Sequence, residues 1–314
     1  MNPSMESLDH VKLNFSPSGL LFLNIALAFI MFGVALDIKF SDFIDVVKRP
    51  KSVITGMMSQ FLLLPFFTFL LVLILDPAPT IALGMILVST CPGGNISNFI
   101  SSMAKADTAL SVSLTAIATI YAIFITPMNF ALWGDFYIRY YNHSAAALLR
   151  PLEIDQWQMF ETVFILLGIP VIVGLLFAYR FPGITGKIRK PLRVGSVVFF
   201  IMMVVILLWS NFSHFLKYVH LVFFIVLIHN ALALGVGYLF STITRRPIPD
   251  RRTIAIETGI QNSGLALALI FNPKIFPPNL ALGGMAVVAA WWGVWHIVSG
   301  LALATFWGNK TVLA

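Results

Sequence analysis

The sequence predicts an all-α polytopic membrane protein with about nine transmembrane helices. Hydrophobic residues make up 59% of the 314 positions and charged residues only 11%, whereas about a quarter of an ordinary soluble domain is charged. The mean hydropathy of the chain is +0.91. Apolar runs recur that are long enough to cross about 30 Å of hydrocarbon. These runs cover residues 18–37, 51–75, 78–104, 107–133, 157–180, 192–212, 219–243, 251–272 and 279–307.

The ends of the chain and the third run need separate interpretations. Residues 1–17 carry charges of both signs without the basic segment and cleavage site of a signal peptide, so we expect a short N-terminal tail. Residues 308–314 form a C-terminal tail. The run 78–104 contains Pro92-Gly93-Gly94. We interpret this run as one broken helix, although two short re-entrant helices would give the same pattern.

Basic residues cluster in three of the connections between spans, after the first, fifth and seventh. By the positive-inside rule, these connections are cytoplasmic, which places the N-terminus outside and the C-terminus inside. The basic residues concerned are Lys39, Lys48, Arg49 and Lys51, then Arg180, Lys187, Arg189, Lys190 and Arg193, then Arg245, Arg246, Arg251 and Arg252. Charges that flank spans in this way do not form the single basic patch of a nucleic-acid-binding protein.

The order of the spans indicates an inverted-topology repeat. An external connection at 134–156 leaves four spans in the first half, residues 18–133, and five in the second half, residues 157–307. Each half has one interrupted helix at a corresponding place, broken at 92–98 and at 257–264. Such a pair of broken helices is typical of secondary transporters, whose binding site lies between the repeats near the bilayer midplane.

Glu257 is the strongest single indication of a functional site. A carboxylate at membrane depth costs about 3 kcal/mol on insertion scales, and it normally has a functional partner. Two glutamine or asparagine amides and two glycines follow it within the break at 257–264. Carboxylate, amide and hydroxyl oxygens suit a hard cation. We therefore expect sodium to bind at Glu257.

Two motifs resemble the sodium/bile acid symporter family. The first is Cys91–Asn98 followed by Lys105–Thr115, and the second is Glu257–Gly264. Further matches are Met31-Phe32-Gly33, Leu36, Gln60 and Val294-Trp295-His296. The resemblance covers the chain from about residue 25 onward. It implies a core domain built on two crossed broken helices, a panel domain of the other spans, and inward movement of an organic anion coupled to sodium. The nine-span form resembles the liver and ileal carriers of mammals.

The resemblance also implies two sodium sites and an anion site. The first sodium site would use Ser97, Asn98, Ser111, Thr115 and Glu257. The second would use Gln60, Gln261, Glu257 and backbone carbonyls near Thr258 and Ile260. The anion would contact Asn95, Ile96 and Asn262 between core and panel. His296 matches a family motif and is included in the anion site, although packing at a helix interface is the favoured role. His229 and Asn230 are expected to form interhelical hydrogen bonds outside the site.

Other functional classes have less support. The sequence shows no nucleophile paired with a base, no phosphate-binding glycine loop and no cluster of histidines and cysteines, so we predict that the protein is not an enzyme. No cofactor is expected beyond two coupling sodium ions. The expected partners are a small organic anion, sodium and the lipid of a plasma membrane or bacterial inner membrane. A proton-coupled or efflux carrier of similar architecture, and a membrane sensor that binds ligand without transporting it, are the alternatives.

Overall fold

The computed structural model describes residues 17–38, 49–144, 155–210, 212–276, 280 and 282–309. Lys39 and Lys48 lie outside these residues. So do the two predicted tails, except for residues 17, 308 and 309. Helices account for all the regular secondary structure of the described residues, apart from one isolated bridge. The α-helices are α2 (Pro17–Asp37), α4 (Pro50–Met58), α5 (Leu64–Leu75), α6 (Pro79–Thr90), α7 (Ile96–Met103), α8 (Thr108–Ser144), α9 (Gln156–Val163), α10 (Ile169–Arg180), α11 (Pro182–Ser210), α12 (Phe212–Ile243), α13 (Ile248–Gly259), α14 (Ser263–Ile270) and α15 (Gly283–Gly308).

Two short π-helices each join two α-helices into one longer span. The π-helix η2 (Ser59–Leu63) joins α4 to α5, and η3 (Phe164–Gly168) joins α9 to α10. Five of the resulting helices are long and apolar enough to cross a membrane, and shorter apolar helices accompany them. The prediction of an all-α, multi-span membrane protein is therefore confirmed.

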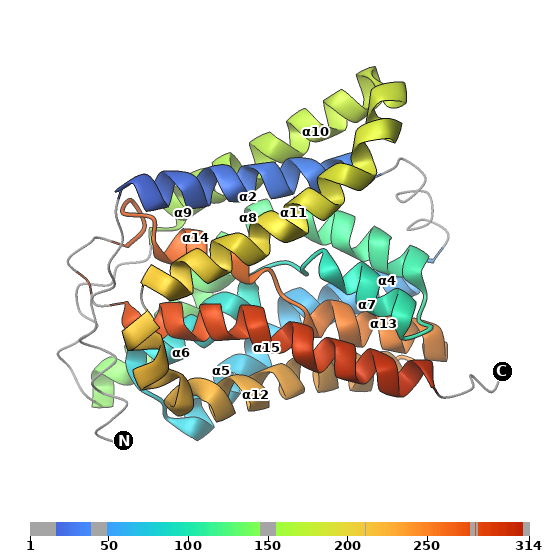
Figure 1. The fold of residues 1–314 in the computed structure, drawn as a ribbon. Helices are drawn as coiled ribbons and strands as arrows, with labels where there is room; N and C mark the ends of the chain where they lie inside the picture. Colours follow the sequence, from blue (N-terminus) through green and yellow to red (C-terminus); the bar gives the residue numbers. More distant parts are fainter. Residues whose placement is uncertain are drawn as a thin grey trace.

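The helices form two groups in space. In Figure 1, α2, α10 and α11 lie along one side of the molecule, and α5, α6, α7, α12, α13 and α15 lie beneath them. Helix α2 packs against both α10 and α11. A Cβ atom at Gly174 of α10 would lie 2.5 Å from the Cβ of Ala35 in α2. The absence of a side chain at Gly174 therefore permits the close approach of these two helices, as small residues do at membrane helix contacts.

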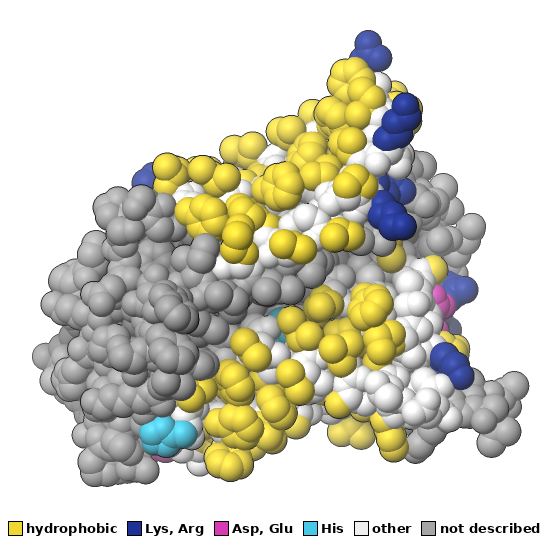
Figure 2. Space-filling view, in the orientation of Figure 1, with side chains coloured by type: hydrophobic (Ala, Val, Ile, Leu, Met, Phe, Trp, Pro, Cys, Tyr) yellow, Lys and Arg dark blue, Asp and Glu magenta, His cyan; other side chains and the backbone are white. Residues whose placement is uncertain are grey.

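The surface of the molecule matches a lipid environment. Figure 2 shows hydrophobic side chains spread over the visible faces of both groups and lysine and arginine side chains gathered toward one edge. Ile74 in α5 and Leu176 in α10 are among the exposed large apolar residues. Figure 1 places the α10–α11 junction and the starts of α4 and α13 at the same end of the molecule. Among the described residues, the basic residues next to these helix ends, such as Arg49, Arg180 and Arg251, thus belong to one end.

Two helices extend further than the sequence predicts. Helix α8 continues through Ser144, into the region 134–156 that was expected to be a connection, with an Arg139–Asp135 ion pair one turn apart at 2.8 Å. Helix α11 begins at Pro182, so Lys187, Arg189 and Lys190 lie in its first turns and not in a loop. Both extensions are polar, and hydropathy detects only the part of a helix that lies in hydrocarbon.

Candidate functional site

The two helix breaks lie against each other. The first break separates α6 from α7, and the second separates α13 from α14. The Gly94 amide donates to the carbonyl of Ile260 at 2.7 Å, and the Asn262 amide donates to the carbonyl of Pro92 at 2.8 Å, around the antiparallel Gly93–Gln261 bridge. Backbone groups released from a helix must find partners inside a membrane protein. Here each break supplies the partners of the other.

The Glu257 carboxylate lies beside this crossing and accepts hydrogen bonds from three hydroxyl groups. Its Oε1 accepts hydrogen bonds from Ser97 Oγ at 2.6 Å and from Ser111 Oγ at 2.5 Å. Thr115 Oγ1 lies 3.1 Å from both carboxylate oxygens and 3.3 Å from Asn98 Oδ1. Glu257 is only 2% exposed. The structure thus brings together all five residues of the predicted first sodium site, from α7, α8 and α13.

Two residues of the predicted second site lie beside Gly93. A Cβ atom on Gly93 would lie 2.9 Å from Glu257 Oε2 and 3.1 Å from Gln60 Nε2, so these two side chains flank the glycine. Gln261 is buried and donates through Nε2 to the Thr258 carbonyl at 2.8 Å. Among the described residues, neither Gln60 Nε2 nor Gln261 Oε1 has a hydrogen-bond partner. Buried amide groups without partners are uncommon, and they mark this place as one that can accept a ligand.

The two backbone carbonyls of the second site each have one hydrogen bond already. Ile260 O accepts from Gly94, and Thr258 O accepts from the Gln261 side chain. A carbonyl oxygen has two lone pairs, so each can also ligate a cation. The candidate ligands of the second site are therefore the Glu257 carboxylate, two side-chain amides and two backbone carbonyls.

The predicted anion-binding residues divide into two kinds. Asn95 is exposed at the start of α7, and Ile96 and Asn262 are half-buried. Asn262 Oδ1 accepts from the Leu265 amide at 3.0 Å, which caps α14 and leaves the amide nitrogen of the side chain as a donor. His296 in α15 is buried, with 3% exposure. His296 is thus buried within the helix packing, whereas the other three residues are accessible beside the breaks.

Asn230, expected from the sequence to form an interhelical hydrogen bond, also supports the second helix break. Asn230 Nδ2 donates to the Gly259 carbonyl at the end of α13 at 2.8 Å, and Ser299 Oγ donates to Asn230 Oδ1 at 2.5 Å. The neighbouring His229 Nε2 lies 2.8 Å from Thr68 Oγ1. The predicted interhelical hydrogen bonds are therefore confirmed. In addition, Asn230 holds the Gly259 carbonyl, two residues after Glu257. In the sequence, the only indication of this role is that His229 and Asn230 form a polar pair within an apolar span.

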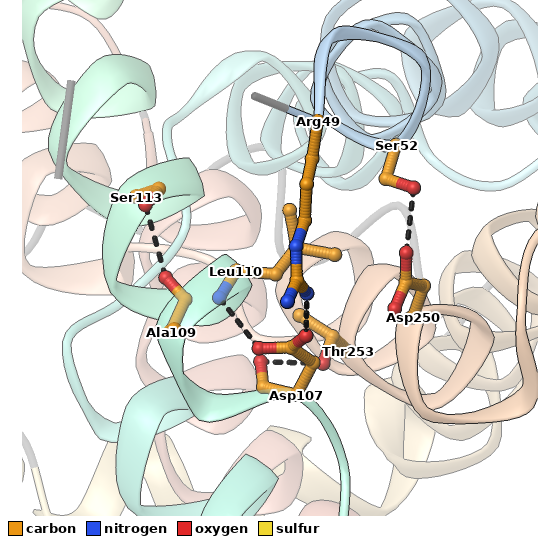
Figure 3. A network of polar contacts seen from close by, with 8 residues as sticks. All are labelled: Arg49, Ser52, Asp107, Ala109, Leu110, Ser113, Asp250 and Thr253. Atoms are coloured by element: carbon orange, nitrogen blue, oxygen red, sulfur yellow. Dashed lines mark hydrogen bonds and ion pairs between the residues drawn. The ribbon is translucent and has the colours of Figure 1, made fainter. Parts of the chain in front are cut away.

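A polar network ties the same helices together at their charged end. Figure 3 shows the Arg49 side chain extended toward the Asp107 carboxylate, with which it forms an ion pair. Ser52 Oγ donates to Asp250 at 2.6 Å, and Thr253 Oγ1 donates to the Asp107 carbonyl at 2.9 Å. This network connects α4, α8 and α13. Those helices belong to the spans that carry Gln60, Ser111 with Thr115, and Glu257.

Substitutions can distinguish the contributions of the two predicted sites to sodium binding. Gln60→Ala should weaken sodium binding at the second site, and Ser97→Ala should weaken it at the first, each by about tenfold or more. Ser97 contacts Oε1 of the Glu257 carboxylate, whereas Gln60 lies beside Gly93 near Oε2, so the double variant should lose more than either single variant. Binding of radiolabelled sodium to the purified protein measures both effects. An unchanged sodium concentration dependence in either variant would contradict its ligand role.

Comparison with known proteins finds relatives that match most of the chain. The family described as the Sodium Bile acid symporter family matches residues 24–218. The uncharacterized sodium-dependent transporter YocS of Bacillus subtilis is 32% identical over 292 residues, which cover 92% of this chain and 84% of that protein. The probable sodium/metabolite cotransporter BASS2 of Oryza sativa is 31% identical over 91% of this chain and 64% of its own length. The human ileal sodium/bile acid cotransporter is 25% identical over 80% of this chain and 70% of its own length.

Proposed function

Because this chain belongs to the sodium bile acid symporter family and is a sodium-dependent cotransporter rather than an enzyme, we propose that it carries an organic anion into the cell together with two sodium ions. The anion is a bile acid-like molecule or a small carboxylate. Asn95, Ile96 and Asn262 would contact it, with His296 as a further contact deeper in the helices. Glu257 would be the residue shared by both cation sites.

The observation that carries this proposal is the environment of Glu257. Among the described residues, no lysine or arginine pairs with this carboxylate, although it is buried. Its neighbours are instead three neutral hydroxyl groups from two other helices, α7 and α8. A buried charge without a partner is costly. Sodium supplies the missing positive charge, and several neutral oxygen ligands suit sodium better than a proton, which needs only one acceptor.

Transport requires the site to open to each side of the membrane in turn. The two helix groups of Figure 1 support a movement of this kind, with α2, α9, α10 and α11 as the panel and the crossed broken helices with their neighbours as the core. Rocking of one such body against the other is the usual mode in transporters built from inverted repeats. We infer nine spans, with repeats at 18–133 and 157–307.

The membrane orientation is part of the same proposal. The basic residues at one end of the molecule would face the cytoplasm, with the N-terminus outside and the C-terminus inside. The membrane would be a plasma membrane or a bacterial inner membrane. Inward transport from the opposite end would then be driven by the sodium gradient.

The substrate can be sought by ligand stabilisation. A ligand that binds only the folded protein raises its melting temperature, by an amount that depends on its concentration relative to Kd. We expect the correct anion to raise the melting temperature more in sodium chloride than in choline chloride. Flux of that anion into proteoliposomes would then distinguish a transporter from a sensor, and replacement of the sodium gradient by a proton gradient would distinguish sodium from proton coupling.

The charge balance predicts that transport is electrogenic. Two sodium ions and one monovalent anion carry a net charge of +1, and together with Glu257 they leave the loaded site close to neutral. If Glu257 returns without a cation, one positive charge enters per cycle, and roughly 2.3 kcal/mol per 100 mV assists uptake. Uptake into proteoliposomes should accelerate when a potassium diffusion potential makes the interior negative. Indifference to that potential would exclude two sodium ions per monovalent anion.

A further inference from the structure

The span that carries Gln60 contains a π-helix, Ser59–Leu63, which ends two residues before Pro65. Within η2, the Leu64 amide donates to the carbonyl of Ser59, five residues back, instead of the usual four. The next residue, Pro65, has no amide hydrogen, and its ring collides with the carbonyl four residues earlier. That carbonyl belongs to Phe61. The other π-helix, η3, also ends two residues before a proline, Pro170, which supports proline as the cause.

A side chain from another helix replaces the donor that Pro65 lacks. Asn129 of α8 donates through Nδ2 to the Phe61 carbonyl at 2.7 Å. Asn129 is 7% exposed, and Phe61 is 6% exposed. The Phe61 ring packs against Ala118 and Ala122 of the same helix. Asn129 therefore fastens the π-helical backbone to α8, the same helix on which the Phe61 ring packs.

Asn129 lies on the face of α8 that carries the first sodium site. Ser111, Thr115, Ala118, Ala122 and Asn129 follow one another at spacings of three, four or seven residues, which keeps them on one side of a helix. Ser111 and Thr115 contact Glu257 at one end of this face. Asn129 holds the π-helix at the other end. One helix thus connects Glu257 to the backbone beside Gln60.

We propose that Asn129 is a positioning residue for the second sodium site, where it holds the π-helix Ser59–Leu63 in the register that directs Gln60 toward Glu257. The inference rests on the proposed sodium binding by Gln60 and Glu257. A π-helix is rare and inserts an extra residue into a turn. Loss of the Asn129 hydrogen bond leaves the Phe61 carbonyl buried without a donor. The backbone then rearranges to satisfy it, and Gln60, which adjoins Phe61, changes direction.

The first test removes the hydrogen bond with little change in shape, by Asn129→Leu. Binding of radiolabelled sodium to the purified full-length protein should then need an about tenfold higher sodium concentration for half-saturation, the effect expected when a group that orients a metal ligand is lost. The same substitution in a Gln60→Ala background should cause no further loss, because the residue that Asn129 positions is already absent. A purely structural role for Asn129 would lower affinity in both backgrounds alike or in neither.

Thr68→Val provides the matched control. It removes a buried interhelical hydrogen bond, that between Thr68 and His229, from the same long helix but beyond Pro65. We expect this control to lower the melting temperature in sodium-free buffer and to leave sodium half-saturation at the wild-type value. If Asn129→Leu behaves like Thr68→Val, the proposal is overturned.

A second variant decides the matter even if Asn129→Leu does not fold. Pro65→Ala restores an amide hydrogen four residues after Phe61 and so favours a continuous α-helix without the extra residue. We expect sodium affinity to fall by a similar factor while the melting temperature rises or stays the same. Wild-type sodium affinity in Pro65→Ala would overturn the proposal. Absence of sodium binding in the wild-type protein would overturn the proposed function and this inference with it.

Discussion

Replacement of Glu257 by alanine or glutamine is expected to abolish sodium-dependent uptake. Glu257 supplies the charge of both proposed cation sites, and three hydroxyl groups are arranged around its carboxylate. Loss of a group that only orients a metal ligand costs up to about 100-fold in affinity. Glu257 would itself be a ligand, so we expect sodium affinity to fall by more than this factor. Radiolabelled sodium binding to purified protein and uptake in proteoliposomes measure the effect.

The Glu257 variants should remain folded, because removal of a buried charge lowers a cost of folding. Their melting temperature in sodium-free buffer should equal or exceed that of the wild type, and added sodium should no longer raise it. Glu161→Ala is the matched control, since this glutamate pairs with Lys274 at 3.6 Å in a half-exposed position away from the crossing. Sodium dependence like that of the wild type in Glu257→Gln would refute the assignment.

Gly93→Ala is expected to have the second largest effect on sodium binding. The added methyl group would lie 2.9 Å from Glu257 Oε2 and 3.1 Å from Gln60 Nε2, which is too close for either group to stay in place. Both neighbours are ends of side chains, so they can move aside without unfolding the protein. The movement separates the proposed ligands of the second site. We expect an at least tenfold higher sodium concentration for half-saturation, which is about 1.4 kcal/mol.

The control for Gly93→Ala is a glycine with free space around it. A Cβ atom at Gly235 of α12 would meet no other atom within 4 Å among the described residues, and alanine there should stabilise the helix by up to about 1 kcal/mol. Gly235→Ala should therefore bind sodium normally and melt at the same or a higher temperature. If Gly93→Ala also binds sodium normally, Gln60 and Glu257 do not share a cation across Gly93.

The sequence allowed much of the candidate site to be predicted because its features are unusual in apolar helices. Pro92-Gly93-Gly94 and the charge of Glu257 stand out within hydrocarbon-length runs. Hydropathy alone predicted the multi-span, all-α class. Helices α8 and α11 extend into polar sequence beyond the predicted apolar runs, because hydropathy has no signal where a helix leaves the membrane.

Asn129 could not be found in the same way. Its partner is the carbonyl of Phe61, and every residue has a carbonyl, so no pattern in the sequence distinguishes this one. The need for an external donor arises from Pro65, which lies far from Asn129 along the chain. Asn230 is similar, since its partner is the Gly259 carbonyl at the end of α13. In the sequence, both asparagines resemble ordinary polar residues of membrane helices.

The sequence by itself determined the membrane class, the two helix breaks and the carboxylate of Glu257 at the second break. These features depend on composition, helix-breaking residues and charge, which act locally. Only the tertiary structure decided which groups meet: that Gly94 pairs with Ile260, that Ser97, Ser111 and Thr115 converge on one carboxylate, and that Asn129 holds the π-helix beside Gln60. The physical reason is that these contacts join segments distant in the chain. Their partners are set by how closely helices pack and by the need of backbone groups released from a helix to find partners inside the protein.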